Sequence, residues 1–206
     1  MNLQTVRRRM NPDERRAQLL AHGVRVFAQL GIGRASHAEV ARAAGVSVAT
    51  VFNYFPSREN LVEQVLSQVD DFLTGMMASV EASSLKAPEA LYRLMTVFAG
   101  AAKTDTDMIR VWLEWSTSIR DDTWPKYLEF QERVIDRIEQ VIVAGKLVGT
   151  VAADVDPEDA ARIAAGDAHM VALMQFAHKT SADMDRFLRH LVESVLKIPS
   201  IDGVMR

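Results

Sequence analysis

The sequence predicts an all-α protein, with a small basic N-terminal domain before a larger helical domain. Apolar residues recur at helical spacing along most of the 206 residues, whereas the alternating pattern of strands is nearly absent. Capping residues precede many of these segments, and glycine follows several of them. The charge is divided as well: residues 1–60 carry nine arginines and four acidic residues, while residues 61–206 carry 15 basic and 23 acidic residues.

The first helix is expected over residues 12–30. Asn11 can cap it, Pro12 suits its first position, and Glu14 stands where a capping box places an acidic residue. Gly31 follows the last apolar residue of the periodic pattern. The segment therefore carries both a start and a stop signal.

A second and a third helix follow, joined by a short turn. Ser36 opens a capping box for a short helix that stops at Gly45, and Ser47 caps a helix over residues 48–55. The unit 36–55 therefore has the length and pattern of a helix-turn-helix, with the first helix packed across both.

The sequence of the remaining residues predicts six more helices. Ser57 caps a helix that reaches about residue 79–82, and Asp105 and Ser181 are expected to cap two others. Loops are expected over residues 82–88 and 146–156. The remaining helices are expected over 88–103, 106–119, 124–144 (ending at Gly145), 157–178 and 181–198.

Composition argues against several classes of function. The chain has no cysteine, so disulfides and thiolate sites are excluded, and no apolar run is as long as a bilayer requires. Its first residues are polar and basic, unlike a signal peptide, so a cytoplasmic protein is expected. The five histidines show no metal-binding spacing, and neither a P-loop nor a GxSxG motif is present. We therefore expect no enzyme activity, no metal and no cofactor.

The third helix carries side chains suited to reading DNA. Asn53 can pair with adenine, while Val48 and Ala49 can meet a thymine methyl group. A helical hairpin whose polar residues merely face water is the plain alternative. The basic N-terminal quarter favours DNA. The residues expected to contact DNA are Arg7, Arg8, Arg9, Ser36, His37, Ser47, Val48, Ala49, Thr50, Phe52, Asn53, Tyr54, Ser57 and Arg58.

Two segments resemble a known family. The stretch "VSVATVFNYFPSRENLVEQVL" (46–66) resembles the DNA-binding signature of the TetR family of bacterial transcription regulators. The longer stretch over residues 27–66, together with "VWLEWSTSIRDDTWP" (111–125), is similar to the LuxR/HapR/SmcR group of quorum-sensing master regulators. The resemblance implies a transcriptional regulator, such as a repressor, that binds a pseudo-palindromic double-stranded DNA operator as a homodimer.

An apolar cluster in the larger domain fits either a plain core or a cavity. Trp112 and Trp115 lie on neighbouring faces of one helical turn, and several methionines accompany them. The resemblance favours a pocket for a small apolar or amphipathic effector, with Gln131 offering a polar contact. The residues expected to line it are Leu73, Met76, Met77, Trp112, Trp115, Gln131, Val134 and Met174.

The last two helices carry more apolar surface than one helix face needs. A symmetric four-helix interface between two chains would bury the surplus, and the resemblance implies the same assembly. The interface is expected to include Met170, Phe187, Leu188, Leu191 and Val195.

These observations predict two domains. Residues 1–56 would form the DNA-binding domain with a basic arm, and residues 57–206 the regulatory and dimerisation domain. The alternative function is a helical ligand-binding or adaptor protein without specific DNA binding.

Overall fold

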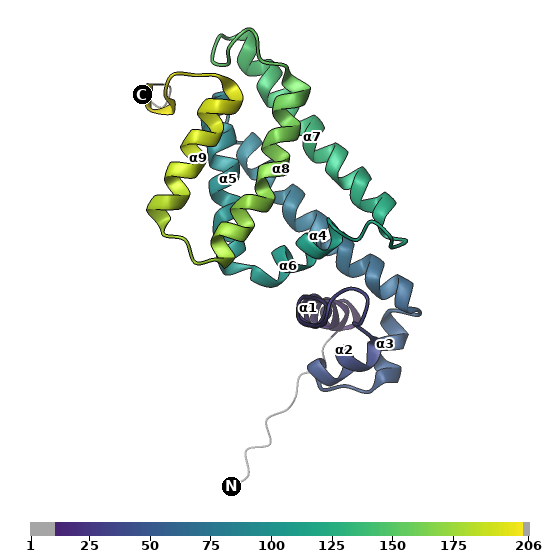
Figure 1. The fold of residues 1–206 in the computed structure, drawn as a ribbon. Coiled ribbons are helices and arrows are strands. Elements are labelled where there is room, and N and C mark those ends of the chain that lie inside the picture. Colours follow the sequence, from purple (N-terminus) through teal and green to yellow (C-terminus); the bar gives the residue numbers. More distant parts are fainter. Residues whose placement is uncertain (1–10, 204–206) are drawn as a thin grey trace. The chain divides into compact units, whose positions relative to one another are not determined.

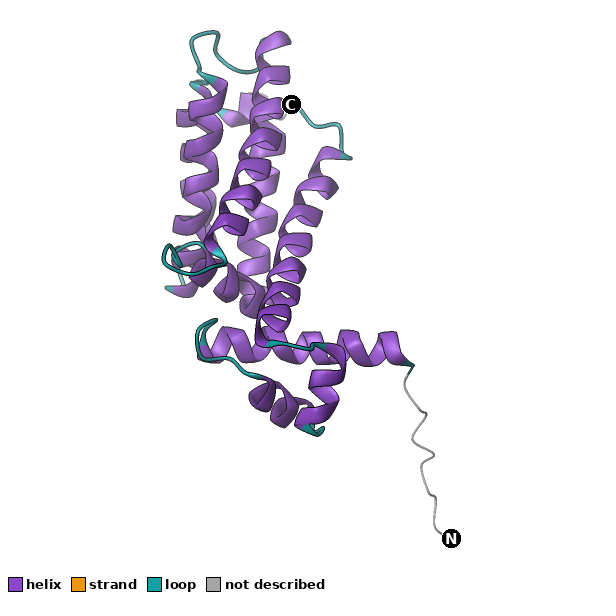
Figure 2. Cartoon of the chain, turned by 90° about the vertical axis from the view of Figure 1, so that its right-hand side faces the viewer, coloured by secondary structure: helices purple, strands orange, loops and turns teal. Residues whose placement is uncertain are grey.

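The computed structural model describes residues 11–203, and within this range the chain is built of helices and loops without a strand (Figure 2). The predicted all-α fold class is confirmed. Arg7, Arg8 and Arg9 lie outside the described residues. The helices in order are α1 (Pro12–Leu30), α2 (His37–Ala44), α3 (Val48–Tyr54), α4 (Arg58–Glu81), α5 (Ala87–Thr104), α6 (Thr106–Trp115), α7 (Trp124–Leu147), α8 (Pro157–Phe176), α9 (Ser181–Leu196) and the short 3-10 helix η1 (Ile201–Gly203) (Figure 1).

The chain divides into two compact units between Ser67 and Gln68, within α4. In the first unit, α2 packs against both α1 and α3. Phe27, Val40, Val51 and Phe55 are fully buried there and form the small core that α1, α2 and α3 share. The functional boundary after residue 56 stays a prediction.

In the second unit, α5 is the central helix. It contacts α6, α7, α8 and α9, and α8 in turn packs against α7 and α9 (Figure 1). Burial of Met95, Phe98, Ile109, Ile138 and Leu188 marks the core between these helices. The surplus apolar residues of this unit thus serve first to hold its own helices together.

Local signals at the first three helices act as expected. The amide of Glu14 donates to Asn11 Oδ1 (2.7 Å), and the Glu14 carboxylate accepts from the Asn11 amide (3.0 Å), which completes the capping box. Gly45 takes the left-handed conformation (φ 66°) that ends α2 and begins the turn.

Other boundaries differ from the expectation. Helix α6 stops at Trp115 rather than at residue 119, because the hydroxyls of Ser116 and Ser118 donate to the carbonyls of Leu113 and Glu114 and compete with the helical pattern. Thr180, not Ser181, caps α9, since its Oγ1 accepts from the Asp183 amide (3.1 Å).

Helix α7 continues through Gly145 to Leu147, so the expectation that this glycine ends the helix was wrong. The left-handed conformation falls instead on Gly149 (φ 74°), in the following turn. Gly145 lies in close contact with Ala87 and Val151, and its missing side chain makes that contact possible.

Candidate functional site

In the first unit, one face of α3 is exposed among the residues that the structure describes. Val48, Ala49, Phe52 and Asn53 are exposed, and Phe52 keeps 46% of its surface accessible. Val51 is fully buried and anchors the helix to the core. An exposed aromatic ring beside two aliphatic side chains and an amide is unusual for a solvated face, and it fits a recognition surface.

The start of α3 is fixed by Ser47 and Thr50. The Thr50 amide donates to Ser47 Oγ (3.1 Å), and the two hydroxyls are hydrogen-bonded to each other at 2.8 Å. Tyr54 is half-buried at the other end of the helix. The ends of this seven-residue helix are therefore held, and its exposed residues have a defined orientation.

His37 is not on the surface, and its assignment as a DNA contact is corrected. The residue is only 5% exposed, because its ring stacks on Phe52 at 3.9 Å and its Nε2 donates to the Phe55 carbonyl (2.7 Å). His37 thus braces the exposed ring of Phe52 from behind and ties α2 to the end of α3.

Ser36, Ser57 and Arg58 also have structural partners. The hydroxyls of Ser36 and Ser57 accept from the amides of Glu39 (3.4 Å) and Asn60 (3.1 Å). Arg58 Nη2 donates to the carbonyls of Ile32 (2.6 Å) and Gly33 (3.0 Å) and so fixes the loop between α1 and α2. The sequence pattern did not predict that Arg58 would contact this loop.

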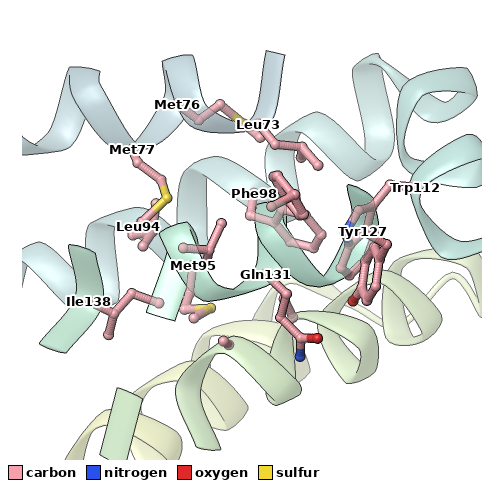
Figure 3. Close-up of a pocket in the computed structure, with 14 residues that line it drawn as sticks. Leu73, Met76, Met77, Leu94, Met95, Phe98, Trp112, Tyr127, Gln131 and Ile138 are labelled. Atoms are coloured by element: carbon pink, nitrogen blue, oxygen red, sulfur yellow. The ribbon is translucent and has the colours of Figure 1, made fainter. Parts of the chain in front are cut away.

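In the second unit, an apolar cavity lies between α4, α5, α6, α7 and α8 (Figure 3). Its volume is about 70 Å³, whereas roughly 10–15 Å³ suffices for one water. The structure places six of the expected residues on its wall: Leu73, Met76, Met77, Trp112, Gln131 and Val134. Phe98 and Phe130, which belong to the same expected apolar cluster, also line it. The remaining lining residues were not among those expected: Leu94, Met95, Tyr127, Ile138, Ala165 and Ala168.

Trp115 and Met174 do not line this cavity. The Trp115 indole Nε1 donates to the Thr123 carbonyl (3.1 Å), and its ring stacks on Phe130 at 5.6 Å, so it fastens the turn after α6. Helix α8 presents Ala165 and Ala168 to the cavity, and Met174 lies almost two helical turns beyond them.

The Trp112 end of the cavity carries aromatic and polar groups. Phe98 meets the indole edge-on at 5.3 Å, and the His169 ring lies 4.4 Å from it. His169 Nε2 is 2.9 Å from Ser116 Oγ, and burial lowers the pKa of this histidine. Gln131 and Tyr127 are thus the polar residues that line the cavity, while His169 contacts Trp112 without lining the cavity itself.

The expected dimer surface needs correction. Leu188, Leu191 and Val195 are buried within the protomer, packed into the core of the second unit, so they are not available to a partner. Phe187 is half-buried on α9. Of the last two helices, α8 carries the exposed large apolar residues: Ile163, Met170 and Leu173 follow one helix face and each keep about half of their surface.

Two absences hold for the described residues. No cluster of three or more His, Cys, Asp or Glu side chains within residues 11–203 could hold a metal ion. None of the helices in the same range combines the length and hydropathy that a membrane span requires.

Comparison with known proteins places these features in context. Residues 19–65 match the sequence profile of bacterial regulatory proteins of the tetR family. The HTH-type transcriptional regulator LuxR of Vibrio harveyi is 32% identical over 183 residues, covering 86% of this chain and 87% of LuxR. The HTH-type transcriptional repressor KstR2 of Rhodococcus jostii is 24% identical, covering 88% of this chain and 89% of KstR2.

Solved structures show the same fold. A putative TetR-family regulator from Rhodococcus sp. superimposes with a TM-score of 0.77 at 21% identity, covering 89% of this chain and 99% of that one. The regulator FadR from Bacillus subtilis, crystallised with stearoyl-CoA, gives a TM-score of 0.71 at 18% identity, covering 87% of this chain and 97% of FadR.

Proposed function

Because this chain belongs to the TetR family of bacterial transcriptional regulators, we propose that two copies bind a pseudo-palindromic DNA operator, with α3 of each copy in one half-site. The observation that carries the proposal is the exposed surface of α3, where Val48, Ala49, Phe52 and Asn53 project from a capped helix. Such a helix fits the major groove, which admits one α-helix and displays a distinct pattern for each base pair.

The chemistry of this surface favours A·T pairs. The Asn53 amide can accept from and donate to the major-groove edge of adenine at once, while Val48 and Ala49 offer methyl groups to the thymine methyl. Phe52, supported from behind by His37, and Tyr54 suit contact with the sugar-phosphate chain. We therefore expect half-sites rich in A·T pairs.

Selection of bound sequences from random DNA with the full-length chain tests the proposal. Enrichment of a two-fold symmetric site would support it and supply the operator. The alternative, a helical ligand-binding or adaptor protein, predicts binding without sequence preference and no enriched motif. The same outcome would contradict the proposed function.

Replacing Asn53 with alanine should weaken binding to the selected operator by ~1–3 kcal/mol and relax the preference at the adenine it contacts. The measurement is fluorescence anisotropy with the operator and with single-base variants at several salt concentrations. The salt slope should not change, since no phosphate contact is removed. Asn60→Ala is the matched control, because Asn60 lies on α4 and not on the exposed face of α3. Equal base preferences in both variants would remove Asn53 from the recognition surface.

The proposal includes regulation by a ligand in the cavity. Helix α4 runs from Arg58 to Glu81 without interruption and contributes Leu73, Met76 and Met77 to the cavity wall. A ligand that favours one position of this helix would shift the population of DNA-binding conformations, typically with a coupling of ~1–3 kcal/mol. We also propose a quorum-sensing role, because residues 111–125 resemble the LuxR/HapR/SmcR group. Comparing transcripts at low and high cell density, with and without the gene, tests that role.

A further inference from the structure

A second, smaller apolar cavity adjoins the one near Trp112. Its walls come from α4, α5 and α7, and Met77, Leu94 and Ile138 border both cavities. In Figure 3 these three side chains lie at one end of the larger cavity, with Trp112 and Tyr127 toward the other. Only flexible aliphatic side chains therefore separate the two spaces, and methionine adapts its shape most easily.

Together the two cavities form an elongated site. The lining residues of α4 extend from Leu73 to Glu81 and those of α5 from Ala90 to Phe98, so the end residues are eight positions apart in each helix. At a rise of ~1.5 Å per residue this is a length of roughly 12 Å. A site of this shape suits an extended chain better than a compact ring system.

An ion pair lies on the wall of the smaller cavity. Arg137 Nε and Nη2 donate to the two carboxylate oxygens of Glu81 (2.8 and 2.7 Å), and Arg137 Nη1 donates to the Thr74 carbonyl (3.2 Å). Among the described residues that line the two cavities, Arg137 and Glu81 are the only charged ones. The Arg137 side chain is 25% exposed and that of Glu81 is 41% exposed.

We propose that this site binds an elongated amphipathic monocarboxylate, whose hydrocarbon chain fills the two cavities and whose carboxylate takes the place of Glu81 on Arg137. The proposal deepens the ligand regulation included in the proposed function and rests on it for any effect on DNA binding.

The geometry of the ion pair favours this exchange. Arg137 already presents its guanidinium fork to a carboxylate, and such bidentate recognition is selective for planar anions. Glu81 is the more exposed partner, so it can turn into water while a ligand carboxylate takes its place. Hydrogen bonding from Arg137 lowers the pKa of Glu81, which shows the preference of this position for an ionised carboxyl group. The chain of the ligand gains stability by leaving water for an apolar wall.

The test uses the full-length chain and isothermal titration calorimetry with decanoate, decanol and methyl decanoate. We expect one decanoate per chain, bound at least about tenfold more tightly than decanol, as a hydrogen-bonded charged head group implies. Affinity should rise from hexanoate to decanoate as the longer chain extends from the smaller cavity into the larger one. Equal affinity for decanoate and decanol would overturn the proposal.

Two variants with opposite expected effects separate this role from a purely structural ion pair. Arg137→Gln should weaken decanoate binding about tenfold and leave decanol binding unchanged, whereas Glu81→Gln should tighten decanoate binding by removing the internal competitor. A structural ion pair predicts the same direction for both variants. Circular dichroism reports whether each variant folds. If Arg137→Gln does not fold, the tighter decanoate binding expected of Glu81→Gln still tests the proposal.

Arg133→Gln is the matched control. Arg133 lies one turn earlier on α7, pairs with Asp70 and does not line either cavity, so its loss should leave decanoate binding unchanged. Operator binding by the unliganded chain is measured separately. If that binding is specific but decanoate does not bind, the ligand proposal fails alone. If no operator is found, the proposed function fails, whatever decanoate does.

Discussion

Replacing Met170 with aspartate is expected to convert the proposed dimer into monomers that keep their helical fold. Met170 is 47% exposed on α8, on the face that also carries Ile163 and Leu173. If two chains pack these faces together, the aspartate is buried without a partner in both copies, which costs about 3–5 kcal/mol. Sedimentation at micromolar concentration gives the mass, and circular dichroism gives the helix content.

Two further variants make this result specific. Leu191→Asp changes a residue that is 6% exposed and packed within the protomer, so it should lower the free energy of unfolding rather than separate folded chains. Ile119→Asp places the same charge at an exposed apolar residue outside α8, and it should leave mass and stability unchanged. A Met170→Asp variant that still sediments as a dimer would exclude this face of α8 from the interface.

The contrast between Met170 and Leu191 shows how far the sequence predicts the last two helices. Their existence and approximate bounds follow from apolar periodicity and from Pro157 at the start of α8. The sequence does not predict which apolar face packs against the protomer's own core and which stays exposed, because both faces carry aliphatic residues. That choice depends on packing against α5 and α7, which periodicity within a single helix does not contain.

The cavity near Trp112 was also predicted only in part. Periodicity and the two tryptophans point to the correct region, and the expected residues of α4 and α7 lie on the wall. Trp112 and Trp115 are separated by about 60° around the helix, so one can face the cavity while the other turns away. Trp115 is drawn into the turn after α6 by the Thr123 carbonyl, a contact that the helical pattern does not predict. On α5, Leu94 could have been found from its helical spacing to Phe98.

The first unit was predicted in more detail because its signals are local. Caps at Asn11, Ser36 and Ser47 and the left-handed Gly45 act within a few residues of their own positions. His37 was misassigned because its partner carbonyl, on Phe55, lies 18 residues away. A histidine at the start of a helix could face either solvent or the core, and only the fold decides between them.

Gly145→Ala is expected to destabilise the protein, although alanine favours helix over glycine. A Cβ atom at this position would lie 2.5 Å from Ala87 Cβ and 2.6 Å from Val151 Cγ2. Ala87 Cβ is fixed to the backbone of α5 and cannot rotate away, so α5 or the loop after α7 must move. Overpacking of this kind typically costs ~1–3 kcal/mol. The measurement is urea unfolding, with an unchanged m value as the sign that the compactness of both states is retained.

Gly100→Ala gives the opposite expectation and serves as the control. Gly100 is an exposed interior residue of α5, and no atom lies within 4 Å of the position its Cβ would take. Alanine should therefore stabilise α5 by up to ~1 kcal/mol, because it loses less conformational entropy on folding than glycine does. If both variants raise the urea midpoint equally, the close approach at Gly145 does not constrain the fold. If the two variants move the urea midpoint in opposite directions, Gly145 is required for the contact of α7 with the start of α5. The glycine then stands at the end of the apolar pattern because of packing and not because it ends the helix.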